Sequence, residues 1–574
     1  MSATMILPGV YIDVQSEGLI APGQVTVGNL GVVGTAAKGQ LNQPILLSSY
    51  NDAIAFFGSY DSFMDPNDPS ARRSNSLTLV RALELAFNSG ATTVYAMRVA
   101  DNTAASATAT LQSPSGACVV LTAASPGTWG NAITAAVAAP GGGDVLMDET
   151  VVTLTAAQAV AKQITLDHAS TASGRNRVII RNLDGSVSAP SVVSGAPAVG
   201  QVQFSGSTLL FGDNLVAGDI VTADYSVDST TFVKVTLALG TTKEVYLVTD
   251  GNMLVSLVGN PQNPSALVTA TAGAHASEHP TAPQTLPFTG GNDGAGFSGY
   301  NDATLYDPLL DVDAHIILAA GQSDVRAGAG LDAHCQKAST DVFKRDRIAI
   351  VGSDFVSTST SPLTPTQIAS YVDRLIGNTL GSDRVVFVAP GIQAVSAAAE
   401  DQAVNPITLS GAYTAAVIAG MLAAMPAHFS LTNKTVAVPN LELKFNNAQL
   451  TELVQNRVMA LEIDRGIRVL RGQTTDTGAF REITTRRIVD YAKYGVRSAA
   501  GPYIGLLNND RVRAALRATI NSFLKSMLDD EMLVGYGLDV TATRDQQIAG
   551  IVQVTITLQP VFSINFIRVT MILS

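Results

Sequence analysis

Residues 314–320 read AHIILAA, and uninterrupted apolar runs of the same kind follow as RIAIVG at 347–352 and RVVFVAP at 384–390. Segments with helical periodicity follow the second and third runs, at 366–377 and 411–425. Short apolar runs that alternate with helices are typical of a mainly parallel sheet covered by helices on both faces. The sequence therefore predicts an α/β core here.

The same alternation is present near the start of the chain. VTVGNLGVVGTA at 25–36 has the character of an apolar strand, SLTLVRALELAFNSG at 76–90 that of a helix ending on glycine, and TTVYAMRV at 92–99 that of a second strand. If these strands join the later sheet, the core is discontinuous in sequence. We therefore predict a mainly parallel or mixed core sheet, built from residues 25–100 and 286–550.

The region between these two parts, residues 101–285, has a different composition. It is rich in Ala, Thr, Ser, Gly and Val, and its short alternating segments, such as RVIIRN and TFVKVTLAL, are separated by turn residues. Between residues 101 and 300 there are 6 Lys and Arg against 14 Asp and Glu, a net charge of −8. We expect one or two inserted all-β domains at the surface.

The chain closes on IVQVTITLQPVFSINFIRVTMILS at 551–574. Apolar and polar residues alternate strictly from Val552 to Leu558, which indicates a half-buried strand, and the alternation changes phase near Phe566 and Ile567. An unpaired apolar strand invites aggregation, so a sheet must accept it. We expect 551–559 to pair within its own chain and about 562–573 to leave it.

Two helical segments before this end carry most of the basic charge, at 485–499 and 508–530. Residues 481–525 contain 9 Lys and Arg against 3 Asp and Glu, a net charge of +6. In the second segment Arg513, Arg517 and Lys525 fall at steps of four or eight residues on one helix face. This basic ridge is either a solvated surface or a salt-sensitive dock for an acidic partner.

Composition excludes several classes of protein. The 574-residue chain has a formal net charge of −12 and a sequence pI near 5.0, which argues against direct nucleic-acid binding. Cys118 and Cys335 lie far apart and lack metal-ligand spacing. No Lys or Arg precedes Lys38, and the apolar run at 415–425 is too short to span a bilayer. We expect a soluble chain made in the cytoplasm, without membrane insertion.

Three motifs resemble catalytic or ligand-binding patterns, but their residues and spacing do not support such a role. HASEH at 275–279 matches a zinc-protease pattern, yet its glycine- and proline-containing surroundings disfavour the helix that metal binding needs. GNLGVVGTAAKG at 28–39 lacks the lysine–hydroxyl pair of a phosphate loop. His334 and Cys335 are adjacent, so their side chains diverge on a helix. We predict no enzyme activity: no catalytic, cofactor-binding or metal-binding residue, and no cofactor.

Several motifs, in this order along the chain, resemble the contractile tail sheath proteins of phages. They are PGVYI at 8–12, PGTWGN at 126–131, FTGGNDG at 288–294, the strand HIILAA, the helix RRIVDYAKYGVR at 486–497 and the closing pair of long strands. The same superfamily includes the sheaths of R-type bacteriocins, extracellular injection systems and type VI secretion. The resemblance covers most of the two core regions and is anchored in 101–285 by PGTWGN alone.

The resemblance implies a structural subunit that stacks as hexameric rings in a helical polymer around a tail tube and contracts to drive the tube through the host envelope. Its partners would be further copies of itself, the tube protein, and baseplate and terminator proteins. It would be part of the virion, in its contractile tail, assembled in the host bacterial cytoplasm. The large insertion favours a phage particle over a bacteriocin.

In such a subunit, terminal arms at about 7–15 and 552–573 reach neighbouring subunits. They lie within an N-terminal arm and linker, 1–24, and within the C-terminal strands and arm, 551–574. SEGLIAPGQ at 16–24 and TRDQQIAG at 543–550 would act as hinges. The basic ridge would face the tube. Carried onto this sequence, the inter-subunit residues of the N-terminal arm are Val10, Tyr11, Ile12 and Val14. Those of the C-terminal arm are Phe562, Ile564, Phe566, Ile567, Val569 and Met571.

Two alternatives stay open on the sequence. An α/β enzyme with an inserted β domain would share the core pattern but lacks a recognisable catalytic constellation. A static assembly subunit, of a capsid or a surface layer, would share the apolar arms but not a contracted form.

Overall fold

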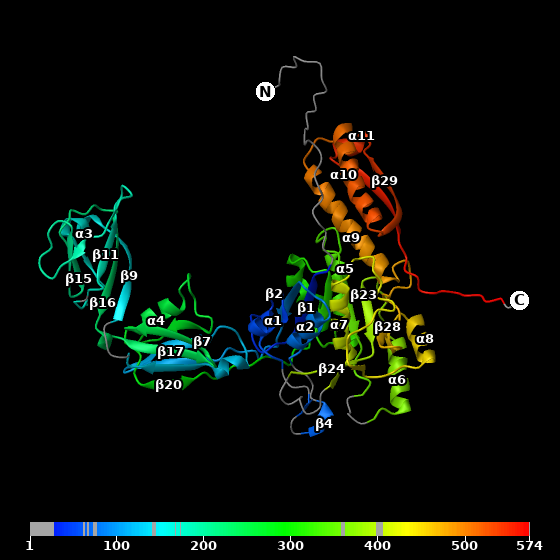
Figure 1. Cartoon of the computed structure of the whole chain (residues 1–574), viewed down its shortest axis with the longest axis horizontal. Coiled ribbons are helices and arrows are strands. Elements are labelled where there is room, and N and C mark those ends of the chain that lie inside the picture. Colours follow the sequence, from blue (N-terminus) through cyan, green and yellow to red (C-terminus); the bar gives the residue numbers. More distant parts are fainter. Residues whose placement is uncertain are drawn as a thin grey trace, which may run out of the picture. The chain divides into compact units, whose positions relative to one another are not determined.

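The computed structural model describes residues 28–60, 64–65, 68–72, 77–140, 145–166, 168–172, 174–357, 362–397 and 406–572. The chain divides into two compact units (Figure 1). The core unit consists of Met1–Ala104 and Asp293–Ser574, and the inserted unit of Ala105–Asn292. The inserted unit thus begins and ends a few residues later than the insertion that the sequence suggested, 101–285.

The core unit is built on an eight-stranded sheet of the described residues, in the order β2-β5-β1-β21-β22-β23-β27-β28. The six inner strands run parallel, and β2 and β28 are antiparallel edges. In chain order the strands are β1 (Leu30–Gly34), β2 (Pro44–Leu47), β5 (Val94–Arg98), β21 (Ile316–Ala319), β22 (Ile348–Gly352), β23 (Val385–Ala389), β27 (Met459–Ile463) and β28 (Ile467–Val469). Strands from both ends of the chain therefore share one sheet, which confirms the predicted mixed α/β class.

Each inner strand is buried on both faces because its residues alternate between two hydrophobic cores. In β22, Ile348 and Ile350 face one core, and Ala349 and Val351 face the other. This double burial explains why the strands are uninterrupted apolar runs in the sequence. The first core is covered by α1 (Tyr50–Phe57), α2 (Leu79–Asn88) and α7 (Gly411–Ala423). The second is covered by η4 (Ala303–Asp311), α5 (Ala329–Ala338), α6 (Pro365–Ile376) and α8 (Asn447–Gln455).

Short elements complete the part of the core unit that precedes its C-terminal region. They are β3 (Met64–Asp65), β4 (Asp68–Arg72), η3 (Gly299–Asn301), the π-helical turn η5 (Asp324–Gly328), β24 (Ile392–Ala394), β25 (Ile407–Leu409) and β26 (Asn440–Leu441). β24, β25 and β26 pair as a small antiparallel sheet.

The inserted unit contains two hydrophobic cores rather than one. The first is formed by β6 (Thr108–Ser113), β7 (Gly116–Ala123), β8 (Thr134–Ala138), β17 (Val233–Leu239), β18 (Thr242–Val248), α4 (Gly251–Val258), β19 (Val268–Ala272) and β20 (Gln284–Pro287). The second lies, in sequence, between β8 and β17 and is formed by β9 (Val145–Thr153), β10 (Gln163–Thr165), β11 (Arg177–Arg181), β14 (Gln201–Ser205), β15 (Thr208–Phe211) and β16 (Ile220–Val227). The same part of the chain also contains α3 (Ala156–Ala161), β12 (Val187–Ser188) and β13 (Ser191–Val192). The unit is therefore mainly β, but α3 and α4 correct the expectation of an all-β insertion.

Two of the quoted motifs meet at the base of the inserted unit. The Asn131 amide of PGTWGN donates to the Gly291 carbonyl of FTGGNDG (3.0 Å) and accepts from the Gly291 N–H (2.8 Å). A Cβ on Gly291 would lie 2.4 Å from the Gly127 carbonyl oxygen, so only glycine fits. Close to this point Ala105 and Asn292, the first and last residues of the inserted unit, pair as an isolated bridge. The two motifs therefore lie beside the point at which the chain enters and leaves the inserted unit.

Candidate assembly site

The C-terminal region of the core unit has a small core of its own. It contains α9 (Ile483–Ala500), η7 (Gly501–Tyr503), α10 (Asp510–Asp529), β29 (Leu533–Thr541), α11 (Arg544–Ile548) and β30 (Gln553–Pro560). The N-cap of α10 is Asn509, whose side chain accepts from the Val512 N–H at 2.9 Å, and Asp510 lies in the first turn. The suggested hinge 543–550 instead forms α11, which begins with a Thr543 capping box.

The terminal strand pairs within its own chain. β29 and β30 form an antiparallel hairpin, the only strands of this sheet among the described residues. Tyr536 lies opposite Leu558 and Leu538 opposite Ile556, and these half-buried side chains cover the helices. The strand ends at Pro560, which has no N–H to continue the ladder. A two-stranded sheet leaves both edges without a partner in the described chain.

The helix pair beneath the hairpin is not fully covered along β30. A groove of about 320 Å³ runs between β30 and α9, lined by Val489, Ala492, Lys493, Val496, Arg497, Ile556 and Leu558. A second hollow of about 320 Å³ lies at the start of β30, against the loop that joins α9 to α10. The edge of β30 can therefore accept both backbone hydrogen bonds and apolar contacts.

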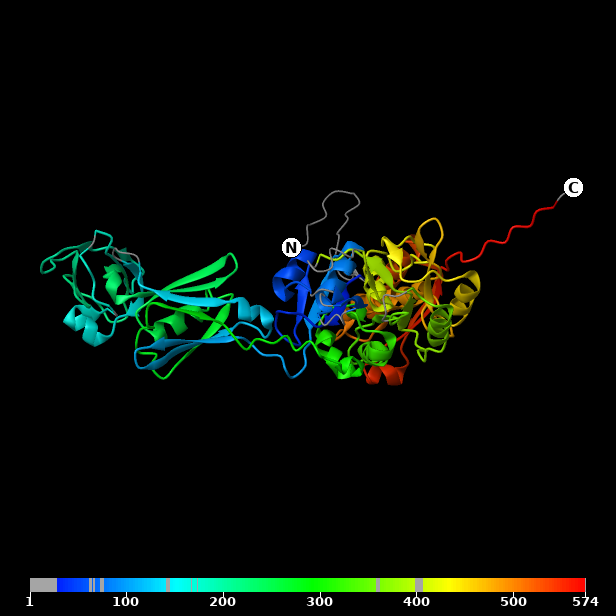
Figure 2. The ribbon, with the colours of Figure 1, turned by 90° about the horizontal axis from the view of Figure 1, so that it is seen from below.

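The segment after β30, Val561–Ile572, forms no helix or strand and leaves the helices as an extended trace (Figures 1 and 2). The six predicted residues of the C-terminal arm, Phe562, Ile564, Phe566, Ile567, Val569 and Met571, are 66% to 86% exposed. Such a row of large apolar side chains in water is unfavourable unless another surface covers it. The predicted residues of the N-terminal arm, Val10, Tyr11, Ile12 and Val14, and the suggested hinge at 16–24 lie outside the described residues.

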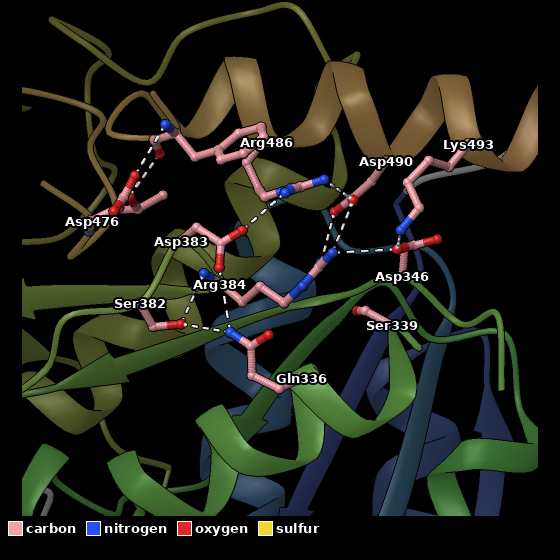
Figure 3. A network of polar contacts seen from close by, with 12 residues as sticks. Gln336, Ser339, Asp346, Ser382, Asp383, Arg384, Asp476, Arg486, Asp490 and Lys493 are labelled. Atoms are coloured by element: carbon pink, nitrogen blue, oxygen red, sulfur yellow. Dashed lines mark hydrogen bonds and ion pairs between the residues drawn. The ribbon is translucent and has the colours of Figure 1, made fainter. Parts of the chain in front are cut away.

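A buried network of charges fixes α9 to the core sheet (Figure 3). The carboxylate of Asp346, which is fully buried, pairs with Arg384 at 3.3 Å and with Lys493 and Arg497 of α9. Asp490 of α9 accepts from Arg384 at 3.1 Å. One core arginine thus bridges two carboxylates, one before β22 and one on α9.

The network continues toward the start of α9. Arg486 donates to Asp490 at 2.6 Å and to Asp383 at 2.9 Å. Burial raises the pKa of Asp490, and the guanidinium groups of Arg384 and Arg486 oppose that shift. Arg487 donates to the Met425 and Pro426 carbonyls just beyond α7. Charged side chains from both halves of α9 are therefore attached to the core sheet or to the end of a core helix, while apolar residues of α9 pack in the C-terminal core.

The predicted basic ridge is reduced by contacts within the chain. Arg513 is 12% exposed; it donates to the Asn508 side chain at 2.7 Å and pairs with Asp510. Arg517 and Lys525 are exposed, although Arg517 also donates to the Leu538 carbonyl at 3.4 Å. Several other basic side chains of this region likewise pair with carboxylates in the α9 network. The local charge count therefore overstates the positive surface.

The usual ligand position of an open α/β sheet is filled by protein. Ligands in such folds bind at the carboxyl ends of the strands where the strand order reverses, here between β1 and β21. At the neighbouring end of β22, a Cβ on Gly352 would lie 1.8 Å from the Gly411 carbonyl oxygen at the start of α7. A Cβ on Gly321 would lie 2.8 Å from the Tyr413 hydroxyl. The start of α7 thus packs directly over this edge.

The motifs that resemble catalytic or metal-binding patterns have structural roles in the fold. HASEH forms a turn, with His275 3.8 Å from Glu278. Cys335 is fully buried in α5, and burial raises the pKa of its thiol to about 12. His334 lies 3.1 Å from the Arg347 guanidinium. Within the described ranges, no cluster of three or more His, Cys, Asp or Glu side chains is arranged to hold a metal ion. None of the helices described combines the length and hydrophobicity that crossing a bilayer requires.

Sequence reasoning missed the residues that attach α9, although a pattern was present. RDRIAIVG and SDRVVFVAP place an Asp-Arg pair directly before each of two neighbouring buried strands. In the structure these pairs, Asp346–Arg347 and Asp383–Arg384, line one edge of the sheet. The repeated pair could have indicated a shared polar edge, but not its partner, Asp490, more than 100 residues later.

Comparison with known proteins agrees with this architecture. Residues 475–574, which include α9, α10, the hairpin and the arm, match the family model of the phage tail sheath C-terminal domain. Among curated proteins, none matches the chain.

Solved structures of two sheath tail proteins share the fold over nearly the whole chain. The protein of Desulfitobacterium hafniense is 16% identical, with 97% of both chains covered and a TM-score of 0.54. That of Listeria innocua is 13% identical, with 94% of both chains covered and a TM-score of 0.57. The resemblance to tail sheath proteins that the motifs indicated is therefore confirmed.

Proposed function

We propose that this protein is a structural subunit of a contractile tail sheath, and that it polymerises by exchanging terminal strands with neighbouring copies. The observation that carries the proposal is the combination of an extended apolar arm with a two-stranded hairpin that has open edges in the same chain. The tail sheath family model matched by this region and the shared fold of the whole chain support it.

The proposed acceptor is the edge of β30. A strand added there would gain main-chain hydrogen bonds and place alternate side chains in the groove above α9. About five such hydrogen bonds, at a net of roughly 0.5 to 1.5 kcal/mol each, stabilise one link by several kcal/mol before side-chain burial. The donors would be the C-terminal arm of one neighbour and the N-terminal arm, with Val10, Tyr11, Ile12 and Val14, of another.

The proposed polymer consists of hexameric rings stacked around a tail tube, and it contracts to drive the tube through the host envelope. Arg517 and Lys525 are the available cations of the predicted tube-facing ridge, because Arg513 is engaged within the chain. The inserted unit would lie at the outer surface. Baseplate and terminator proteins would bind the two ends of the polymer, which would be assembled in the host cytoplasm as part of a virion.

In this proposal the energy of contraction is stored in the extended packing, and no nucleotide is consumed. The α9 network supports such a mechanism because its ion pairs join α9 to the core and would keep the C-terminal region attached while subunits rotate. The packing of α7 against the carboxyl edge of the sheet disfavours the alternative of an α/β enzyme.

Electron microscopy of the native particle tests the proposal. The expected result is a helical tube with two states that differ in diameter and pitch. A tube with a single, unchanging geometry would support a static assembly subunit, and a monomer that turns over a small substrate would contradict both.

A further inference from the structure

The chain immediately after β30 lies on the core, but the odd-numbered residues now face the core instead of the even-numbered ones. Up to Pro560 the even-numbered residues of β30 are half-buried and the odd-numbered ones are exposed. From Val561 the pattern inverts: Val561, Ser563 and Asn565 are half-buried, while the apolar residues between them are exposed. Polar side chains therefore face the core in this segment.

Asn565 holds this segment through both ends of its amide. Its Oδ1 accepts from the Thr432 hydroxyl and its Nδ2 donates to Glu482 Oε1, each at 3.4 Å. The two partners are themselves fixed. Thr432 Oγ1 accepts from the Gly472 N–H at 3.1 Å, and Glu482 forms a salt bridge with Arg471 at 2.5 Å.

The next residue adds a contact with the same group. The ring centroid of Phe566 lies 6.0 Å from the Arg471 guanidinium carbon, a cation–π distance. Asn565 and Phe566 also form one wall of a hollow of about 560 Å³, whose floor is formed by Leu450 and Val454 of α8 and by Leu470. Three residues from separate segments, Thr432, Arg471 and Glu482, thus converge on two residues of the arm.

Beyond Phe566 the described chain is free of such contacts. The side chains from Ile567 to Ile572 are all exposed, and no hydrogen bond or ring contact joins them to the rest of the described residues. The change from held to free falls where the apolar alternation of the sequence changes phase. Six extended residues span about 20 Å, the length of one typical strand.

We propose that Thr432, Arg471 and Glu482 form a clasp that keeps residues 561–566 on their own subunit, so that the strand handed to a neighbour begins at Ile567. The inference rests on the proposed function and changes its donor span. Ile567, Val569 and Met571 belong to the donated strand. Phe562 and Ile564 stay at home as an exposed apolar row, which a neighbouring copy of this chain covers because the strand that follows them enters that copy.

Cross-linking the arm at two positions tests where the handover begins. Lys434, which is exposed two residues after Thr432, is replaced by Cys together with either Ser563→Cys or Thr570→Cys, so that the clasp residues stay intact. A bis-maleimide with a spacer of about 17 Å, the span of five extended residues, is used for both pairs. The native thiols of Cys118 and Cys335 are buried and do not compete.

The chain locked at 563 should polymerise as well as the same variant before cross-linking, and the chain locked at 570 should form no tubes in the electron microscope. Loss of polymerisation on locking at 563 would overturn the clasp, because the handover would then include residues 561–566. Normal polymerisation of both locked chains would show instead that the arm is not donated, and the proposed function would fail with the clasp.

Proteolysis of the unassembled chain tests the clasp without polymerisation. Trypsin should cut after Arg568 at least about tenfold faster than chymotrypsin cuts after Phe562, relative to each protease's rate on the unfolded chain. Asn565→Asp places a carboxylate beside Glu482 and should accelerate the cut after Phe562 while leaving the cut after Arg568 unchanged. Equal relative rates at the two sites in the unaltered chain would contradict the clasp.

Discussion

Replacing Asp346 by Asn should weaken the attachment of α9 to the core sheet without unfolding the rest of the molecule. Asp346 is fully buried and faces three cations, which lose their charge partner in this nearly isosteric variant. Lys493 and Arg497 are about one-third exposed and can be solvated again, and the buried Arg384 keeps Asp490. We therefore expect a loss of about 3 kcal/mol, at the lower end of the range for a broken buried ion pair.

Native-state hydrogen exchange of the α9 peptide measures this loss directly. A loss of about 3 kcal/mol corresponds to roughly 150-fold weaker protection of the α9 amides. Asp510→Asn is the matched control, because it removes an almost fully exposed carboxylate from an ion pair and should leave α9 unchanged. Trp129, the single tryptophan, lies in the inserted unit and reports the unfolding of that unit. Protection that falls less than about threefold, or equally in both variants, would refute the network as the attachment of α9.

Three further predictions concern helix packing, the basic ridge and pH. Gly495→Ala should destabilise the C-terminal region by about 1 to 3 kcal/mol in urea unfolding, because a Cβ there would lie 1.8 Å from a ring carbon of Phe523 in α10. Gly501→Ala should be tolerated, because no heavy atom lies within 4 Å of the position its Cβ would take. Arg517→Glu should weaken co-sedimentation of the protein with tail tubes, most at low salt, whereas Arg513→Gln should not. Equal binding of both variants to the tubes would show that the ridge is not part of the tube interface. Burial lowers the pKa of His315 from 6.5 to about 4; the Asp313 carboxylate opposes this shift and three arginines reinforce it. The unfolded chain therefore binds the proton first, and stability should fall as pH drops from 6.5 to 4. A His315→Asn variant whose stability falls as steeply would contradict this origin.

The core sheet could be predicted because its pattern is local. The strands of AHIILAA, RIAIVG and RVVFVAP are apolar on both faces, and no other common arrangement of short apolar runs between helices buries both. The pairing of the N-terminal strands with this sheet needed only the assumption of one core. The hairpin strand 551–559 could be predicted for the same reason, since its alternation reports one buried face.

The clasp and the charge network could not be predicted, because each depends on contacts between distant segments. Asn565 reads as an ordinary polar residue in an apolar arm until Thr432 and Glu482 are placed beside it. The basic charge of 481–525 predicts a basic surface, whereas Arg486 and Arg487 are buried partners of core groups. Net charge in a window does not distinguish cations that face water from cations that hold a helix.

Polymerisation of a chain cut after Val561 tests the central claim most directly. A cut before β30 would uncover the C-terminal core, whereas removing 562–574 leaves the hairpin and its register intact. The purified full-length chain should form helical tubes in the electron microscope, and the shortened chain should remain a folded monomer with unchanged α9 protection. Tubes formed equally well by the shortened chain would contradict assembly by donation of the C-terminal arm.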